Sequence, residues 1–300
     1  MTADEYLNEV LVSQNLEEGS DEIKALQKHR AEVEKVIRDN FKDTAVTIRY
    51  AGSKAKGTMD KESYDLDIVS YVSSGDNTAG ESLEAIYDNH KKTLSKNYLV
   101  EAKGSALRLK GCGADNLGVD FHIDVVPGRF TDDTKTDAYL YQSSGDKKRL
   151  KTNLDVHLDY VRESGVIDAI RLAKLWKVRN GLLVRTFVLE LAVIKLLEGH
   201  KKESISKQLE HFFTELRDHS TGICVEDPAN PHGNDLSGCL DDSLKNQLSS
   251  TAKRTLQQIE ASGWEAVFGK AQKQEKAARI EILRNAASAA TPTRPWLPKA

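Results

Sequence analysis

The sequence contains few cysteines and few prolines, and it has no long apolar run. Its three cysteines, Cys112, Cys224 and Cys239, cannot pair into a complete disulfide set. The chain also opens without an apolar leader, so we expect a cytoplasmic protein in a reducing environment. No stretch approaches the roughly eighteen consecutive apolar residues of a transmembrane helix, and no membrane association is expected.

The chain also has little net charge. It contains 43 Lys and Arg against 46 Asp and Glu, a formal net charge of −3. This balance argues against wholesale electrostatic binding to nucleic acid, which is not an expected partner, although a local basic cleft is compatible with the total. With 30% charged and 39% apolar residues, the 300 residues predict a globular protein of one large or two smaller domains.

The first part of the chain, residues 1–165, alternates helical and strand patterns. Ser20 is a capping residue for a predicted helix over 21–41, whose apolar residues recur at helical spacing. A second helix is predicted over 82–95. Strands are predicted over 45–50, 65–72, 98–102, 106–110 and 119–126. We therefore expect an α+β domain built on a mixed sheet.

The second part, residues 166–290, is predicted to be helical. Residues 182–197 are apolar on nearly every side, which indicates a buried central helix. The last segment, 291–300, contains three prolines and is expected to be an extended tail. Further helices are expected over 166–179, 205–218 and 240–263. The boundary between the two domains is placed near residue 165.

A glycine–serine turn follows the first predicted strand. Gly52 lets the backbone approach a phosphate closely, because glycine has no side chain. Backbone N–H groups and the Ser53 hydroxyl would then hold the phosphate oxygens of a nucleoside triphosphate. The segment is not a Walker A loop, since the string G-x-x-x-x-G-K-[S/T] is absent. A Gly-Ser pair alone usually marks an ordinary turn, so its meaning depends on the residues that follow.

Three aspartates follow on two predicted strands. Asp65 and Asp67 share one face of the first strand, because side chains alternate along a strand. Asp124 lies on the later strand, and pairing of the two strands would bring the three carboxylates together. An Asp-x-Asp pair alone is usually a solvated strand face, but the ordered combination with the Gly-Ser turn favours a catalytic site. Asp120 and His122 share the face of Asp124, and a surface or supporting role fits them better than ligation.

Carboxylate clusters of this kind suit phosphoryl transfer assisted by divalent cations. Mg²⁺ prefers carboxylate oxygens, and two ions can clamp the attacking hydroxyl and the leaving pyrophosphate. We therefore predict that Asp65, Asp67 and Asp124 bind two Mg²⁺ (or Mn²⁺) ions. Asp124 is also placed to accept the proton of the attacking hydroxyl as a general base.

The motifs resemble those of a known superfamily. Gly52-Ser53, Asp65-x-Asp67 and the Asp124-Val-Val-Pro segment are similar to the site of DNA polymerase β-type nucleotidyltransferases. Two later segments narrow the resemblance to the 2′-5′ oligoadenylate synthetases and to the bacterial cGAS/DncV-like nucleotidyltransferases, or CD-NTases, of CBASS antiphage systems. These segments are Ile170 to Lys177 and the Asp-Pro-x-Asn-Pro loop over 227–231. The similarity runs from about residue 40 to 240.

The resemblance implies a polymerase β-like palm, a C-terminal helical domain and an active site in the cleft between them. The implied activity is the joining of nucleoside triphosphates into a cyclic di- or trinucleotide second messenger, with release of pyrophosphate. The product would act on an operon-encoded effector. The resemblance also suggests that the tail, which ends in Pro298-Lys299-Ala300, is conjugated to a target by a ubiquitin-like system, although a disordered end is the simpler interpretation.

Two charged residues of the helical part need an explanation. The resemblance implies that Lys174 contacts the nucleoside triphosphate. Without it, a lysine beside Trp176 is more often a solvated residue whose stem covers the aromatic ring. Glu190 lies in an apolar helix and needs a partner. We interpret it as structural and expect Arg171, Arg179 or Arg185 to pair with it.

Two other functions remain open. The same palm could synthesise a linear oligonucleotide or add nucleotides to an RNA end, which would require a basic groove across the helical half. Candidates for such a groove are Lys195, Lys201, Lys202 and Lys207, but acidic residues are interleaved with them. The fold could also be a binding module without activity. The intact acidic set argues against that alternative, because clustered carboxylates repel one another when no cation is bound.

Overall fold

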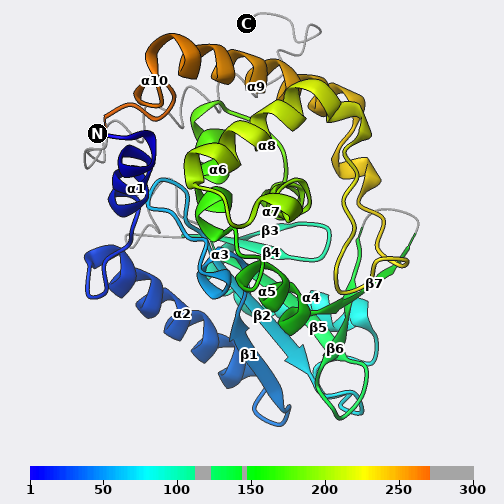
Figure 1. Ribbon diagram of the computed structural model, residues 1–300. Helices are drawn as coiled ribbons and strands as arrows, with labels where there is room; N and C mark the ends of the chain where they lie inside the picture. The colour runs from blue at the N-terminus through cyan, green and yellow to red at the C-terminus, as the bar shows by residue number, and fades with distance from the viewer. Residues whose placement is uncertain (112–122, 144–146, 271–300) are drawn as a thin grey trace, which may run out of the picture.

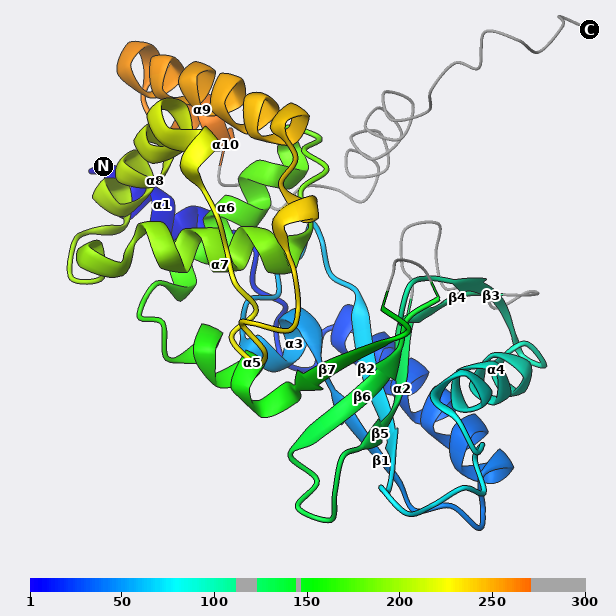
Figure 2. The same cartoon turned by 90° about the vertical axis from the view of Figure 1, so that its right-hand side faces the viewer.

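The computed structural model describes residues 1–111, 123–143 and 147–270. The predictions for Cys112, Asp120, His122 and the tail from residue 291 lie outside these ranges. The chain has a half built on a β-sheet and a half built from helices, which lie one above the other in Figures 1 and 2. The α+β class predicted from the sequence is therefore confirmed.

Within the described residues, seven strands form one mixed sheet. The order is β1-β2-β5-β4-β3, and β6 pairs with the later part of β5 and with β7. Strands β2 and β5 run parallel, whereas the other pairs are antiparallel. The strands are β1 (Val46–Tyr50), β2 (Leu66–Val72), β3 (Tyr98–Ala102), β4 (Leu107–Gly111), β5 (Ile123–Phe130), β6 (Asp137–Tyr141) and β7 (Arg149–Asn153).

Helices cover the sheet and build the rest of the molecule. The side chain of Ser20 caps α2, as predicted, by accepting a hydrogen bond from the backbone N–H of Ile23. The helices of the sheet half are α2 (Asp21–Asn40), α3 (Gly52–Lys56), α4 (Leu83–Leu94) and α5 (Leu154–Arg162). The others are α1 (Ala3–Ser13), α6 (Ile167–Arg179), α7 (Thr186–Leu196), α8 (Ile205–His219), α9 (Asp242–Ser262) and α10 (Glu265–Phe268). Short 3₁₀ turns lie at Glu198–His200, Ser220–Gly222 and Ser237–Cys239.

Alternation along the two parallel strands separates a core face from a polar face. Leu66 and Ile68 of β2 and Ile123 and Val125 of β5 are fully buried, and they pack with residues of α2 and α4 in one apolar cluster. At the start of each strand, the residues that alternate with these apolar ones lie on the opposite face; Asp67 is one of them. Hydrophobic burial on one face therefore fixes which side of the sheet carries the carboxylates.

The helical half has its own apolar core. Trp176 of α6 is fully buried against Phe212 and Phe213 of α8, and its indole N–H donates to Thr255 Oγ1 at 2.8 Å. Helix α7 is buried along most of its length, as predicted, but it begins at Thr186, and residues 182–185 of the predicted helix precede it without helical structure. Leu7, Val10 and Leu11 of α1 belong to the same core, so the first helix of the chain packs with the helical half.

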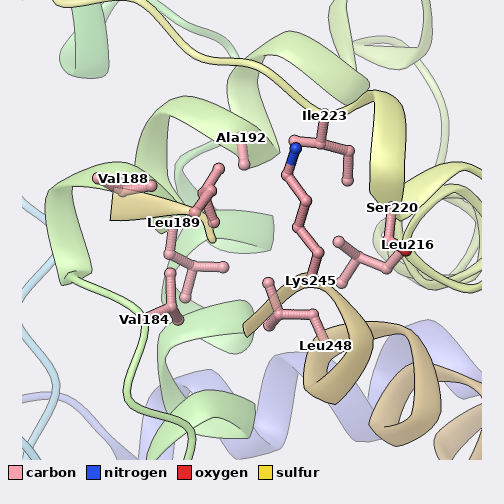
Figure 3. A pocket seen from close by; sticks show the side chains of 10 residues that line it. Val184, Val188, Leu189, Ala192, Leu216, Ser220, Ile223, Lys245 and Leu248 are labelled. Carbon is pink, nitrogen blue, oxygen red and sulfur yellow. The ribbon is translucent and has the colours of Figure 1, made fainter. Parts of the chain in front are cut away.

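A small apolar pocket lies inside this helical core (Figure 3). Its wall comes from α7, α8 and α9, and Lys245 crosses one side of it to donate to the Thr221 carbonyl at 2.9 Å. The residues around it are Val184, Val188, Leu189, Ala192, Leu216, Ser220, Ile223, Leu240, Lys245 and Leu248. The lining is almost wholly apolar, so this pocket belongs to the packing of the helices. No helix of the described residues has the length and apolar character needed to cross a bilayer.

Candidate active site

Two of the predicted carboxylates are direct neighbours across parallel strands. In the register of β2 and β5, Asp67 pairs with Asp124, and the buried Leu66 pairs with Ile123. Both aspartates lie near the start of their strands, at the same edge of the sheet. Asp65 precedes β2 by one residue. The strand pairing expected from the sequence is therefore present, and it places Asp124 beside the Asp-x-Asp pair.

Gly52 brings the glycine–serine turn into contact with Asp67. Its φ of +57° lies in the left-handed region, and a β-carbon here would come 1.7 Å from Asp67 Oδ2. The backbone N–H of Ala51 donates to the Asp67 carbonyl at 2.9 Å, which holds the turn against β2. Ser53 follows in the first turn of α3. The structure therefore joins Gly52, Ser53 and Asp67 at one place, and only glycine fits at position 52.

Asp124 is bound by an arginine that no sequence motif singles out. Arg108 of β4 donates from Nε to Asp124 Oδ1 at 2.8 Å and from Nη2 to Oδ2 at 2.7 Å. The hydrogen bonds that Arg108 donates to Asp124 raise the pKa of Arg108, burial opposes that change, and the charges of Asp124, Asp65 and Glu101 raise it further. The role of Arg108 depends on the pairing of β4 with β5, which no local pattern records.

The donor chemistry of this edge suits a magnesium ion. Asp65, Asp67 and Asp124 offer carboxylate oxygens, which Mg²⁺ prefers, and the glycine–serine turn packs against Asp67. Within the described ranges, however, no three His, Cys, Asp or Glu side chains already form a group that could hold a metal ion. The predicted three-carboxylate cage is not preformed, and both oxygens of Asp124 are bound to Arg108 instead.

Lys174 lies in the interior of the junction between the two halves. Its side chain is 3% exposed, and its amine donates to the Thr58 carbonyl. Burial lowers the pKa of Lys174, while the charges of Asp60 and Glu190 raise it. This lysine therefore holds the segment that follows α3. Its contact with a triphosphate stays a prediction.

Lys177 lies three residues after Lys174 on α6 and is influenced by one of the candidate carboxylates. Its amine donates to Thr186 Oγ1 at 2.9 Å, and the negative charge of Asp65 acts on it. Burial lowers the pKa of Lys177, the neighbouring charge of Lys174 lowers it further, and Asp65 opposes both effects. Sequence reasoning selected Lys174 within this helix and missed Lys177. The signal available was the Lys-x-x-Lys spacing, which puts both amines on one helix face.

The segment that runs from the last residue of α3 toward β2 connects the two halves, because every second residue over 56–62 is a buried polar side chain. Lys56, Thr58, Asp60 and Glu62 are each 8% exposed or less. Lys56 and Thr58 bind Glu190 of α7, at 2.6 Å and 3.0 Å. Asp60 accepts from Arg171 at 2.9 Å, and Glu62 accepts from Arg179 at 3.0 Å. Every second residue of this segment thus faces helix α6 or α7, and the segment leads from the glycine turn directly to Asp65.

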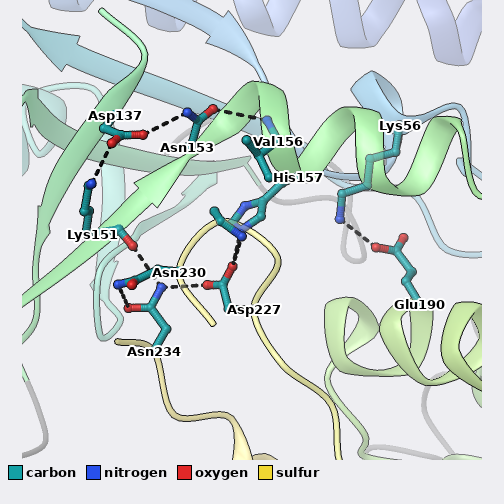
Figure 4. Close-up of polar contacts among 11 residues, drawn as sticks. Lys56, Asp137, Lys151, Asn153, Val156, His157, Glu190, Asp227, Asn230 and Asn234 are labelled. Carbon is teal, nitrogen blue, oxygen red and sulfur yellow. Dashed lines mark hydrogen bonds and ion pairs between the residues drawn. The ribbon is translucent and has the colours of Figure 1, made fainter. Parts of the chain in front are cut away.

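The predicted arginine partner of Glu190 is wrong. Glu190 pairs with Lys56 from the sheet half, as Figure 4 shows. Arg171 and Arg179, two of the expected partners, instead bind Asp60 and Glu62. The reason is geometric: α7 lies beside α3, so the nearest cation comes from a segment more than a hundred residues away in the sequence. The expectation that Glu190 has a structural partner is confirmed.

The Asp-Pro-x-Asn-Pro loop is tied to the sheet half as well. Asp227 Oδ1 lies 2.6 Å from Nε2 of His157 in α5, and its other oxygen accepts from Asn234 at 2.6 Å. Asn234 also donates to the Lys151 carbonyl of β7 at 2.8 Å (Figure 4). Burial raises the pKa of Asp227, but the hydrogen bonds with His157 and Asn234 together hold that pKa below its usual value. The loop therefore fastens the helical half to the sheet half at a second place.

Comparison with known proteins identifies relatives by sequence. No family model matches the chain. The CBASS oligonucleotide cyclase CdnC of Escherichia coli (strain KTE188) is 24% identical over 208 residues, which are 65% of this chain and 65% of CdnC. The cyclic AMP-AMP-AMP synthase of Escherichia coli (strain MS 115-1) is 23% identical over 269 residues, 73% of this chain and 81% of the synthase. The match thus spans slightly less than two thirds of CdnC.

Comparison of folds agrees with the comparison of sequences. The structure of CdnC from E. coli MS115-1 with ATP matches with a TM-score of 0.66 and 19% identity, over 91% of this chain and 99% of CdnC. The polymerase β-like fold of the CD-NTases is therefore confirmed for this chain. The resemblance to CBASS CD-NTases that the motifs indicated is confirmed by sequence and by fold.

Proposed function

We propose that the protein is a metal-dependent nucleotidyltransferase that joins nucleoside triphosphates into a cyclic oligonucleotide and releases pyrophosphate. The observation that carries this proposal is the register pair of Asp67 and Asp124, with Gly52 packed against Asp67. The names of the relatives, an oligonucleotide cyclase and a cyclic AMP-AMP-AMP synthase, support the product class. Such a product would act on an effector encoded nearby.

The side chains of the site would divide the work by position. Asp65, Asp67 and Asp124 would hold two Mg²⁺ ions, which supply charge neutralisation at the transferring phosphate when bound. Gly52 and Ser53 would seat the donor triphosphate, since the turn that contains them packs directly against Asp67. Asp124 would accept the proton of the attacking hydroxyl. The attacking oxygen then bonds to the α-phosphorus as the bond to pyrophosphate breaks.

The helical half would supply the cation that holds the triphosphate from the other side. The predicted candidate is Lys174, but its amine lies inside the junction and is bound to Thr58. Lys177 is a second candidate, because it lies three residues after Lys174 on α6 and is only partly buried. This assignment would place the site between the proposed domain of residues 1–165, which contains α3 and β2, and the proposed domain of residues 166–290, which contains α6 and packs against α1.

Product analysis tests the proposal. The protein is incubated with labelled ATP, GTP, CTP and UTP and with Mg²⁺ or Mn²⁺, treated with phosphatase and examined by mass spectrometry. A cyclic product has no terminal phosphate, so it survives the phosphatase and gives a mass without one. A ladder of linear products that lose their phosphates would instead support the linear synthetase, and extension of added RNA would support the RNA-end transferase. Nucleotide binding without any product would favour the non-catalytic alternative.

A further inference from the structure

Four charged residues form a row across neighbouring strands. In the sheet order β2-β5-β4-β3, the register partners are Asp67, Asp124, Arg108 and Glu101. Arg108 thus has carboxylates on both sides. Its hydrogen bonds, however, go to Asp124, while Glu101 pairs with Lys103 at 2.5 Å and with Lys110 at 3.0 Å. Arg108 therefore pairs with Asp124, whereas Glu101 pairs with Lys103 and Lys110.

The geometry of the Arg108–Asp124 pair occupies both carboxylate oxygens. Nε and Nη2 of one guanidinium donate to Oδ1 and Oδ2, in the two-pronged arrangement that makes arginine–carboxylate pairs strong and directional. The side chains are 28% and 16% exposed, so water screens the pair only in part. A cation that approaches Asp124 must therefore compete with two charge-assisted hydrogen bonds.

The positive charge of Arg108 also lies near the other two carboxylates, Asp65 and Asp67. In the strand register Asp124 lies between Arg108 and Asp67, so the guanidinium lies one strand away from the Asp-x-Asp pair. The guanidinium is therefore close enough to offset part of the repulsion among the carboxylates. This is the electrostatic task that a divalent cation would perform at the same place.

We propose that Arg108 is the resting counter-ion of the carboxylate group and that it competes with the metal ion for Asp124. This inference rests on the proposed function, in which Asp124 is a metal ligand. With the pair intact, Asp124 is withheld from Asp65 and Asp67, and the described residues contain no ready three-carboxylate group. Metal binding exchanges the guanidinium for the ion at Asp124. Arg108 thereby raises the metal concentration that the site requires.

Metal binding without turnover tests the exchange directly. The free Mn²⁺ signal is followed by electron paramagnetic resonance as the full-length protein is titrated with MnCl₂ alone. Arg108→Met removes the charge and both hydrogen bonds, whereas Arg108→Lys keeps the charge and loses the two-pronged geometry. Lys110→Met is the matched control, since it removes a cation from the same strand that pairs with Glu101 and not with Asp124.

The expected result is tighter Mn²⁺ binding by about fivefold in Arg108→Met, a smaller gain in Arg108→Lys, and no change in Lys110→Met. The gain should vanish when Asp124→Asn is added to Arg108→Met. Unchanged or weaker Mn²⁺ binding in Arg108→Met would overturn the proposal and would make Arg108 an orienting partner of Asp124. An equal gain in Lys110→Met would also overturn it, since the effect would then be one of overall charge.

The Mn²⁺ titration separates this inference from the proposed function. Failure of the proposed function would appear as absence of any nucleotide product from the wild-type protein. Failure of the competition would appear in the titration, whether or not a product forms. In protein that turns over, a second readout is the Mg²⁺ concentration for half-maximal rate, which should fall in Arg108→Met. A raised KM for nucleotide at saturating metal would contradict the proposal, because Arg108 would then act on substrate.

Discussion

Gly52 and Asp67 are in such close contact that no side chain fits between them. A β-carbon at position 52 would come 1.7 Å from Asp67 Oδ2 and 2.5 Å from its Cγ, and the backbone of Gly52 is left-handed. The glycine turn and the carboxylate strand therefore have a fixed separation. Because phosphoryl transfer depends on alignment, this contact should set the relative position of the triphosphate and the metal ligands.

Substitution of Gly52 by alanine should abolish most of the activity. The added β-carbon must displace Asp67, and misplacement by about 1 Å is enough to cost a factor of about 100 in rate. Gly57→Ala is the matched control, because Gly57 also has a positive φ but a β-carbon there would meet no atom within 4 Å. Both variants should lose about 1–2 kcal/mol of stability from the left-handed backbone. Equal rates for the two variants in a nucleotide-consumption assay would show that the contact with Asp67 is irrelevant.

Truncation of Glu190 should destabilise the protein strongly. Glu190→Ala leaves Lys56 buried without its partner, and removal of one member of a buried pair costs about 3–5 kcal/mol. Replacement of both residues by methionine should recover most of that loss, since neither member of the pair is then left buried alone. Denaturant unfolding measures both effects. Asp39→Ala serves as the control, because its pair with Lys35 is exposed. A loss in Glu190→Ala no larger than that of Asp39→Ala would refute a buried pair.

His90 should make the sheet half sensitive to acid. It is fully buried between Ser70 of β2 and the Ile86 carbonyl, and burial lowers its pKa to about 4. The unfolded chain binds a proton near the ordinary pKa of 6.5, so the stability from neutral His90 is full above pH 6.5 and is lost as the pH falls toward 4. The loss should reach about 3 kcal/mol.

Urea unfolding of the wild-type protein and of His90→Gln, each at about pH 7 and about pH 4.5, isolates this contribution. The glutamine does not titrate, so the variant should lose less stability than the wild type between the two pH values. Other titrating groups are common to both proteins and cancel in the difference. Parallel pH profiles for the two proteins would mean that His90 is not the buried neutral group described here.

Substitutions of Lys174 and Lys177 should have different effects, one on stability and the other on nucleotide binding. Lys177→Met should raise the KM for nucleotide by about tenfold, the equivalent of one charge-assisted hydrogen bond, with little change in stability. Lys174→Met should instead lower stability, because the Thr58 carbonyl loses its buried partner. The opposite pattern, a raised KM in Lys174→Met with unchanged unfolding, would return the nucleotide contact to Lys174. Steady-state kinetics and thermal unfolding of the two variants make the distinction.

The sequence was sufficient to predict the features that depend on local pattern. Strand β2 and its partner β5 were recognised because apolar residues alternate with Asp67 and Asp124, and the pairing then followed from one face being buried. Gly52 was recognised because close approach of a backbone requires glycine. Strands β6 and β7 and helix α5 were not anticipated, since they are short: the strands have five residues each and the helix has nine.

The features that sequence reasoning missed depend on contacts between distant segments. Arg108 acquires its role only when β4 pairs with β5, and Glu190 acquires Lys56 only when α7 packs beside α3. The resemblance predicts a contact between Lys174 and the nucleotide. In the structure this side chain is buried and donates to the Thr58 carbonyl, because its face of α6 packs against the segment after α3. Local periodicity predicts which face of an element is buried, but not which charge from another element will meet it.

The most direct test of the central claim is the turnover of Asp67→Asn compared with the wild type, under saturating nucleotide and Mg²⁺. The substitution keeps the shape of the side chain and removes its negative charge. Thermal unfolding checks that the fold is retained. Because metal-assisted transfer depends on this carboxylate, we expect a loss of cyclic product of at least about 1000-fold. A wild-type rate of cyclic product in Asp67→Asn would contradict the account of the site.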